Sequence, residues 1–93
     1  MVYLIHFETK LADHAQHYIG YTPNGSVEPR LAMHKNGHGA RILAACNEKR
    51  IEYTVVRVWP NADRKFERWL KNQKNANRFC PACNPNWRRY GND

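Results

Sequence analysis

The sequence predicts a small α/β domain of the α+β kind: a three-stranded antiparallel sheet flanked by helices, in the order β-β-α-α-β-α. Three observations support this prediction. The chain has 93 residues, which suits one domain with one core. Apolar residues make up 42% of it, as in ordinary globular proteins. Short β-branched and aromatic runs alternate with helical patterns between turn residues, so both strands and helices are expected.

The first two elements form a predicted hairpin. Residues 2–7 (VYLIHF) are a β-branched and aromatic run that is typical of a buried strand. Residues 8–15 are polar and are expected to form a loop. Residues 16–22 (QHYIGYT) predict a second strand, which ends at a Pro-Asn-Gly turn. Since the two strands are close in sequence, antiparallel pairing is the simplest arrangement.

Two short helices are predicted next. Ser26 can cap the first of them, and Pro29 lies in its first turn, where a missing N–H has no cost. The helical pattern continues to Lys35, and an Asn-Gly-His-Gly stretch ends it. Residues 40–47 (ARILAACN) predict the second helix.

A third strand and a third helix complete the predicted order. Residues 51–59 alternate, and one face of this strand is predicted to carry Ile51, Tyr53, Val55, Arg57 and Trp59. Residues 62–74 predict a helix. Its inner stripe is predicted to hold Phe66, Trp69, Leu70 and Gln73. A neighbouring polar stripe holds Arg64, Glu67, Arg68 and Lys71.

The charge of the chain favours a polyanionic partner. Fifteen Lys and Arg residues against eight Asp and Glu residues give a net charge of +7, and such a surplus attracts nucleic acid in particular. No apolar run approaches the ~20 residues that span a bilayer. The N-terminal MVYLIHF lacks the features of a signal peptide. We therefore expect a soluble cytoplasmic protein without a membrane partner.

An ordered set of residues carries a family resemblance. In chain order they are Tyr3, the tripeptide Tyr18-Ile19-Gly20, Arg30, His34 and Glu67. The tyrosines fall on the first two predicted strands, the arginine and histidine on the next helix, and the glutamate on the helix after the third strand. Together they resemble the GIY-YIG nuclease superfamily, in particular its small stand-alone members. The resemblance covers residues 1–83, which we assign to a nuclease-like domain, and residues 84–93 form a basic and aromatic tail.

The resemblance implies a metal-dependent endonuclease that hydrolyses DNA phosphodiester bonds. Glu67 is then the ligand of a Mg²⁺ or Mn²⁺ ion, because a hard divalent cation takes a few carboxylate oxygens and keeps several waters. Arg30 is expected to contact the scissile phosphate through its planar guanidinium. The resemblance favours a tyrosine as the general base, and the residues themselves leave three candidates open: Tyr3, Tyr18 and His34.

Basic side chains extend the predicted DNA-binding surface. Four are candidates for contacts with the DNA backbone: Arg41, Arg64, Arg68 and Lys71. For each of them a solvated helix face is the alternative. In the tail, residues 87–90 (WRRY) alternate aromatic and basic side chains, which suits contact with a single strand. Duplex, branched and single-stranded DNA all fit as the partner, and we expect the protein to act as a monomer.

Cys80 and Cys83 have the spacing of half a zinc site. The other ligands of a structural zinc would have to come from Cys46, His6, His14, His17, His34 or His38. The alternative is that the two cysteines pack the third helix against the body of the protein, as small apolar side chains do. The sequence favours this second interpretation, because it holds no second CxxC pair.

Two other functions are compatible with the sequence. Met1 stands where the family has its first glycine, and no asparagine clearly matches the one that the family often carries after the glutamate. A non-catalytic nucleic-acid-binding module on the same fold is therefore the main alternative. The third possibility is an interaction domain without nucleic acid, which would have no salt-dependent affinity for DNA.

Overall fold

The computed structural model describes residues 1–11, 15–23 and 25–84. In chain order the elements are β1 (Val2–Phe7), β2 (His17–Tyr21), α1 (Glu28–Lys35), α2 (Arg41–Glu48), β3 (Tyr53–Trp59), α3 (Arg64–Asn72) and α4 (Ala76–Phe79). The first six confirm the predicted order. The seventh, α4, was not predicted, because four residues are too few to show a helical period.

The three strands form one antiparallel sheet in the order β2-β1-β3. This confirms the predicted fold class and the predicted hairpin between the first two strands. β1 lies in the centre of the sheet, and five of its six residues are buried. A strand that is covered on both faces has to be apolar throughout, which is why this segment is a continuous apolar run rather than an alternating one.

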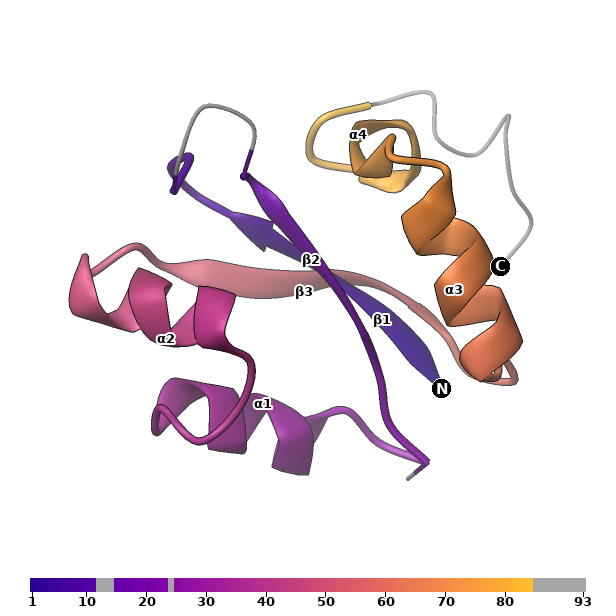
Figure 1. Cartoon of the computed structure of the whole chain (residues 1–93), viewed down its shortest axis with the longest axis horizontal. Helices are drawn as coiled ribbons and strands as arrows, with labels where there is room; N and C mark the ends of the chain where they lie inside the picture. The colour runs from indigo at the N-terminus through magenta and orange to yellow at the C-terminus, as the bar shows by residue number, and fades with distance from the viewer. Residues whose placement is uncertain (12–14, 24, 85–93) are drawn as a thin grey trace.

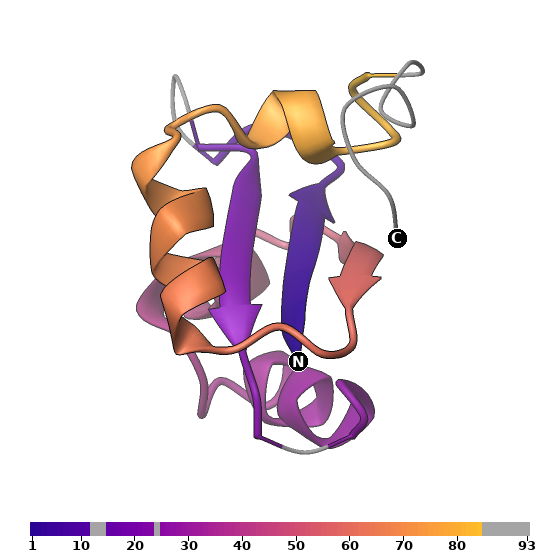
Figure 2. The same cartoon turned by 90° about the vertical axis from the view of Figure 1, so that its right-hand side faces the viewer.

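Helices cover both faces of the sheet. Helices α1 and α2 lie on one face, and α3 and α4 lie on the other (Figures 1 and 2). The core is accordingly split into two clusters by the alternation of side chains along β1. The cluster under α1 and α2 contains Tyr3, Ile5, Phe7, Leu43, Cys46 and Tyr53. The cluster under α3 and α4 contains Val2, Leu4, Ile19, Leu70 and Cys80.

The predicted face assignment of β3 is wrong in its second half. A bulge interrupts the pairing with β1, so that Val55 lies opposite Ile5 but Arg57 lies opposite Leu4. The extra residue reverses the alternation, because a strand has a side-chain period of two. Arg57 and Trp59 therefore point towards α3 and α4. The buried Arg57 guanidinium donates a hydrogen bond to the backbone carbonyl of Phe79 at 3.2 Å and so ties β3 to α4.

The helix ends follow local chemistry. The predicted cap of α1 is wrong: the helix begins after Val27, which forms no side-chain cap hydrogen bond, and the Ser26 hydroxyl accepts a hydrogen bond from the Glu28 N–H at 3.2 Å. Pro29 lies in the first turn, as predicted. α3 begins later than predicted, because the Asp63 carboxylate caps it by accepting a hydrogen bond from the Phe66 N–H at 3.0 Å. It also ends earlier than predicted, at Asn72.

The predicted inner stripe of α3 is only partly correct. Leu70 is buried and Phe66 is half-buried, but Gln73 is exposed and Trp69 is 49% exposed. The Trp69 ring instead stacks on Phe66 at 5.7 Å between ring centroids and meets Phe79 edge-on at 6.2 Å. It therefore belongs to an aromatic seam beside the sheet rather than to the core.

Parts of the sequence-based interpretation lie outside the described residues. These are the aromatic and basic tail at 87–90, the histidine at position 14 and the asparagine of the predicted turn at 23–25. Within the described part of the chain, no helix combines the length and the apolar character needed to cross a membrane.

Candidate functional site

Two tyrosines lie on the sheet face that is covered by α1 and α2. Tyr3 is paired across the strands with Gly20, and Tyr18 is paired with Ile5, so the two phenols point to the same side. Their ring centroids are 6.2 Å apart. A side chain at position 20 would overlap the Tyr3 ring, so the glycine lets that ring lie directly over β2.

His34 completes a contact between α1 and these strands. Its imidazole is buried, and Nε2 lies 2.9 Å from the Tyr3 hydroxyl oxygen. Nδ1 accepts a hydrogen bond from the backbone N–H of Ala40 at 3.2 Å. A backbone N–H can only donate, so in the neutral ring Nε2 carries the hydrogen and donates it to Tyr3. Gly39 makes this geometry possible, because a side chain there would overlap the imidazole.

The titration behaviour of this group has clear physical causes. Burial raises the pKa of Tyr3 well above its ordinary value, and Tyr18 raises it further by charge and by hydrogen bonding, while Arg30 opposes the shift and Glu67 adds to it. Burial lowers the pKa of His34, and the positive charge of Arg30 lowers it further. At neutral pH the group therefore contains a neutral imidazole and a protonated Tyr3 phenol.

Arg30 and Glu67 approach the tyrosines from different layers. Arg30 is half-buried on α1, one turn before His34, so both side chains lie on one face of that helix. Glu67 lies on α3, which packs mainly against the edge strand β2. Its side chain is 16% exposed and forms an ion pair with Lys71 at 3.1 Å. Arg30 lowers the pKa of Tyr3 and Glu67 raises it, so both charges act on the same phenol.

The four predicted DNA-contacting residues are distributed over both helical layers. Arg41 begins α2 and is exposed, whereas Arg64, Arg68 and Lys71 lie on α3. Arg64 stacks over the Tyr21 ring at 4.6 Å, and Lys71 is held by Glu67. They do not share one helix face with Arg41, which lies on the opposite side of the sheet.

A groove of about 620 Å³ lies between the hairpin and the α3–α4 layer. Its walls include Lys10, Lys71 and Lys74, which give it a positive lining suited to a polyanion. The tyrosines and Arg30 do not line it, because they belong to the other face of the sheet. Lys71 connects the two regions, because it both lines the groove and pairs with Glu67.

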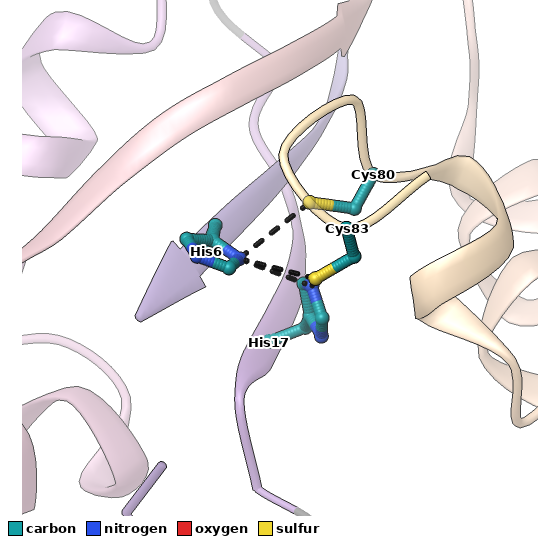
Figure 3. Close-up of side chains that lie close together, drawn as sticks. All are labelled: His6, His17, Cys80 and Cys83. Atoms are coloured by element: carbon teal, nitrogen blue, oxygen red, sulfur yellow. Dashed lines mark hydrogen bonds between the residues drawn. The ribbon is translucent and has the colours of Figure 1, made fainter. Parts of the chain in front are cut away.

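A second group of side chains lies on the α3–α4 face of the sheet. It consists of His6, His17, Cys80 and Cys83, whose ligand atoms all lie within 4.8 Å of one another (Figure 3). The sequence offered the two histidines only among several possible partners of the cysteines. The missing signal was the strand register, which makes His6 and His17 direct cross-strand neighbours.

Comparison of the chain with protein-family models, curated proteins and solved structures gives no match. Function is therefore inferred from the chemistry of the two groups of side chains and from the charge around them.

Proposed function

We propose that the protein is a divalent-metal-dependent endonuclease of the GIY-YIG type, which hydrolyses phosphodiester bonds in DNA. One observation carries the proposal: two phenols and an imidazole meet on one sheet face, and the charges of Arg30 and Glu67 both act on the Tyr3 phenol. Perturbed titrating groups gathered at one point are typical of reactive sites. The residues involved are the ones that carry the family resemblance: Tyr3, Tyr18, Arg30, His34 and Glu67.

Tyr18 is the best placed of the three candidate bases. The Ala40 N–H donates to His34, and the His34 Nε2–H donates to the Tyr3 oxygen. The Tyr3 O–H is then left to donate to Tyr18, in agreement with the hydrogen bond that raises the pKa of Tyr3. The chain of donors is thus directed at the Tyr18 oxygen. Tyr18 is half-buried, whereas Tyr3 is fully buried.

Tyr3 and His34 serve the reaction by holding Tyr18. Tyr3 is 1% exposed and keeps its proton, so it is a poor acceptor for a proton from water. The His34 nitrogen that has a lone pair is occupied by the Ala40 N–H. Tyr3 and His34 therefore orient Tyr18 and direct hydrogen bonds towards it, while Tyr18 removes the proton of the attacking water.

Arg30 and Glu67 supply the charge that phosphate hydrolysis needs. The Arg30 guanidinium stays charged and can donate two parallel hydrogen bonds to the scissile phosphate, where negative charge grows in the transition state. Glu67 fits a Mg²⁺ or Mn²⁺ ion, because its carboxylate is partly exposed and such an ion needs few protein oxygens. When bound, that ion supplies Lewis-acid polarisation of the phosphate. Lys71 holds the carboxylate in place at 3.1 Å.

The test is cleavage of labelled single-stranded, duplex and branched DNA in Mg²⁺, Mn²⁺ or EDTA. We expect metal-dependent cleavage that falls by about 10²–10⁴-fold in Tyr18→Phe, as for loss of a general base, and that is abolished in Glu67→Gln and Arg30→Ala. Glu48→Gln removes an exposed carboxylate on α2 and is the matched control, which should cleave as the wild type does. Full activity in folded Glu67→Gln would contradict the proposed mechanism.

A second candidate function, a non-catalytic nucleic-acid-binding module, is favoured by the lysine-lined groove. A polyanion can lie in such a groove without being cut. In that case DNA would bind in a salt-dependent manner, no condition would give cleavage, and the affinity of Glu67→Gln would equal or exceed that of the wild type. The same set of substrates and variants separates the two functions.

A further inference from the structure

The group formed by His6, His17, Cys80 and Cys83 is assembled from segments far apart in the chain. Cys80 and His6 are 74 residues apart, and Cys83 and His6 are 77 residues apart. The histidines come from paired strands, and the cysteines come from the segment that follows α4 (Figure 3). The fold thus directs two imidazoles and two thiols to one point, on the opposite sheet face from the tyrosines.

Local structure aims both thiols at the histidines. The Cys83 N–H donates to the carbonyl of Cys80 at 3.2 Å, and the Asn84 N–H donates to the same carbonyl at 2.8 Å. This turn brings the two side chains to the same side of the backbone. Cys80 is buried in the core cluster under α3 and α4, whereas Cys83 is exposed and adds little to that packing. Packing alone therefore accounts for Cys80 but not for Cys83.

The distances within the group match a tetrahedral metal site. His6 Nδ1 lies 3.4 Å from His17 Nε2, 3.6 Å from Cys80 Sγ and 3.6 Å from Cys83 Sγ, and His17 Nε2 lies 3.4 Å from Cys83 Sγ. Zinc binds histidine nitrogen at about 2.0–2.1 Å and cysteine sulfur at about 2.3 Å. For a tetrahedron, those bond lengths place two nitrogens about 3.3 Å apart and a nitrogen and a sulfur about 3.6 Å apart. The four measured separations agree with these values.

Hydrogen bonding by itself does not explain the geometry. His6 Nδ1 is within contact distance of three polar atoms. A neutral imidazole nitrogen has either one hydrogen or one lone pair, so the three contacts cannot all be hydrogen bonds. A single cation at the centre accounts for all of them, because every ligand atom then directs its lone pair inwards. The three cysteines of the chain are free thiols, so no disulfide competes for the sulfurs.

We propose that these four residues bind a structural Zn²⁺ ion, which fixes the segment after α4 to the β1–β2 hairpin. Two sulfur and two nitrogen ligands in a tetrahedron are the donor set and geometry that select zinc. Binding releases two thiol protons, and the two thiolates then cancel the charge of the ion. The site holds no ligand position for water or substrate, so its role is to stabilise the fold. The proposal does not rest on the nuclease function.

The proposal predicts about one zinc ion per chain in protein purified without chelator. Elemental analysis gives the metal content, and titration with Co²⁺ in place of Zn²⁺ reports thiolate coordination through its visible absorption. Cys83→Ser, an exposed position, should weaken zinc binding by more than about 10-fold, since even loss of an outer-shell partner has an effect of that size. Chelator should lower the melting temperature of the wild type by more than that of Cys83→Ser.

Cys46→Ala is the control, because Cys46 lies in the other core cluster and away from the group. It should keep full zinc content and the cobalt spectrum. Folded wild-type protein that neither contains zinc nor shows thiolate absorption with Co²⁺ would overturn the proposal. Zinc affinity in Cys83→Ser equal to that of the wild type would also overturn it. Neither measurement involves DNA, so failure here leaves the nuclease proposal standing, and the reverse holds as well.

Discussion

At the scale of single residues, two hydrogen bonds determine the protonation state of His34. The backbone N–H of Ala40 occupies Nδ1, and Tyr3 accepts from Nε2. Protonation of the ring would oblige Nδ1 to release the Ala40 N–H and would add a charge beside Arg30. The groups that face the ring are the phenols of Tyr3 and Tyr18 and the guanidinium of Arg30. Neither the phenols nor the guanidinium favours an imidazolium.

This environment predicts a loss of stability in acid. The pKa of His34 is lowered in the folded protein, so as the pH falls below about 6.5 the unfolded chain binds the proton first. The free energy of unfolding then falls by up to about 1.4 kcal/mol per pH unit until the ring titrates in the folded state as well. His34→Gln keeps an N–H donor and cannot titrate, so its free energy of unfolding should fall less than that of the wild type between about pH 6.5 and 5.

Urea unfolding at several pH values measures this effect, with His38→Gln, an exposed histidine, as the matched control. Other titrating groups act equally in wild type and variant, so the difference between their slopes isolates His34. Identical slopes would show that His34 has no part in the acid sensitivity.

At the scale of elements, the close approach of β1 and β2 depends on Gly20. The Tyr3 ring occupies the space above this residue, and the Tyr3–His34 hydrogen bond in turn fixes α1 to the sheet. Gly20, the glycine of the YIG tripeptide, therefore has a structural role: it leaves space for the Tyr3 phenol, which supports the proposed base Tyr18. Another glycine, Gly25, follows the hairpin in sequence and has open space where a side chain would lie.

Gly20→Ala should destabilise the protein by about 1–3 kcal/mol, because the added methyl group displaces the Tyr3 ring from a packed core. It should also lower cleavage activity, since the displaced ring no longer supports Tyr18. Gly25→Ala should change stability by no more than about 0.5 kcal/mol. Chemical denaturation measures both variants, and equal midpoints for the two would contradict this account of the hairpin.

At the scale of the whole molecule, the chain carries a net charge of +7, and described basic side chains lie on both sides of the sheet. Lys10, Lys71 and Lys74 line the groove beside α3, and Arg41 lies on the other side of the sheet. A nucleic acid bound to such a surface displaces counterions in proportion to the phosphates contacted. The affinity for DNA should therefore fall steeply as the salt concentration rises. The slope of log K against log salt concentration then reflects the number of phosphates that the protein contacts.

Arg68→Ala should lower the DNA affinity and reduce the slope of log K against log salt concentration by about one, if this exposed residue of α3 contacts one phosphate. Lys49→Ala, at the far end of α2, should leave the slope unchanged. Fluorescence anisotropy over a range of salt concentrations makes the comparison. Salt-independent binding in the wild type, or no binding at all, would favour the interaction domain that needs no nucleic acid.

The sequence was sufficient for the elements and for part of the candidate site. The continuous apolar run of β1 and the proline in the first turn of α1 each reflect local chemistry, and each was found where expected. The predicted Ser26 cap was not, because the helix begins one residue later, after Val27. The two tyrosines could be placed on neighbouring strands because a hairpin was predicted, but only the register puts them on one face. The bulge in β3 could not be foreseen, since Val55 and Arg57 alternate normally in sequence and only the pairing with β1 separates their faces.

What the sequence by itself determined is the fold class, the hairpin and the surplus of positive charge, because periodicity, turn residues and composition are properties of neighbouring residues. Only the tertiary structure decided which nitrogen of His34 carries the hydrogen, and that His6 and His17 meet Cys80 and Cys83. These features depend on strand register and on helices packing across a sheet. Residues more than 70 positions apart are brought into contact by the packing of the whole chain, and no local pattern records that contact.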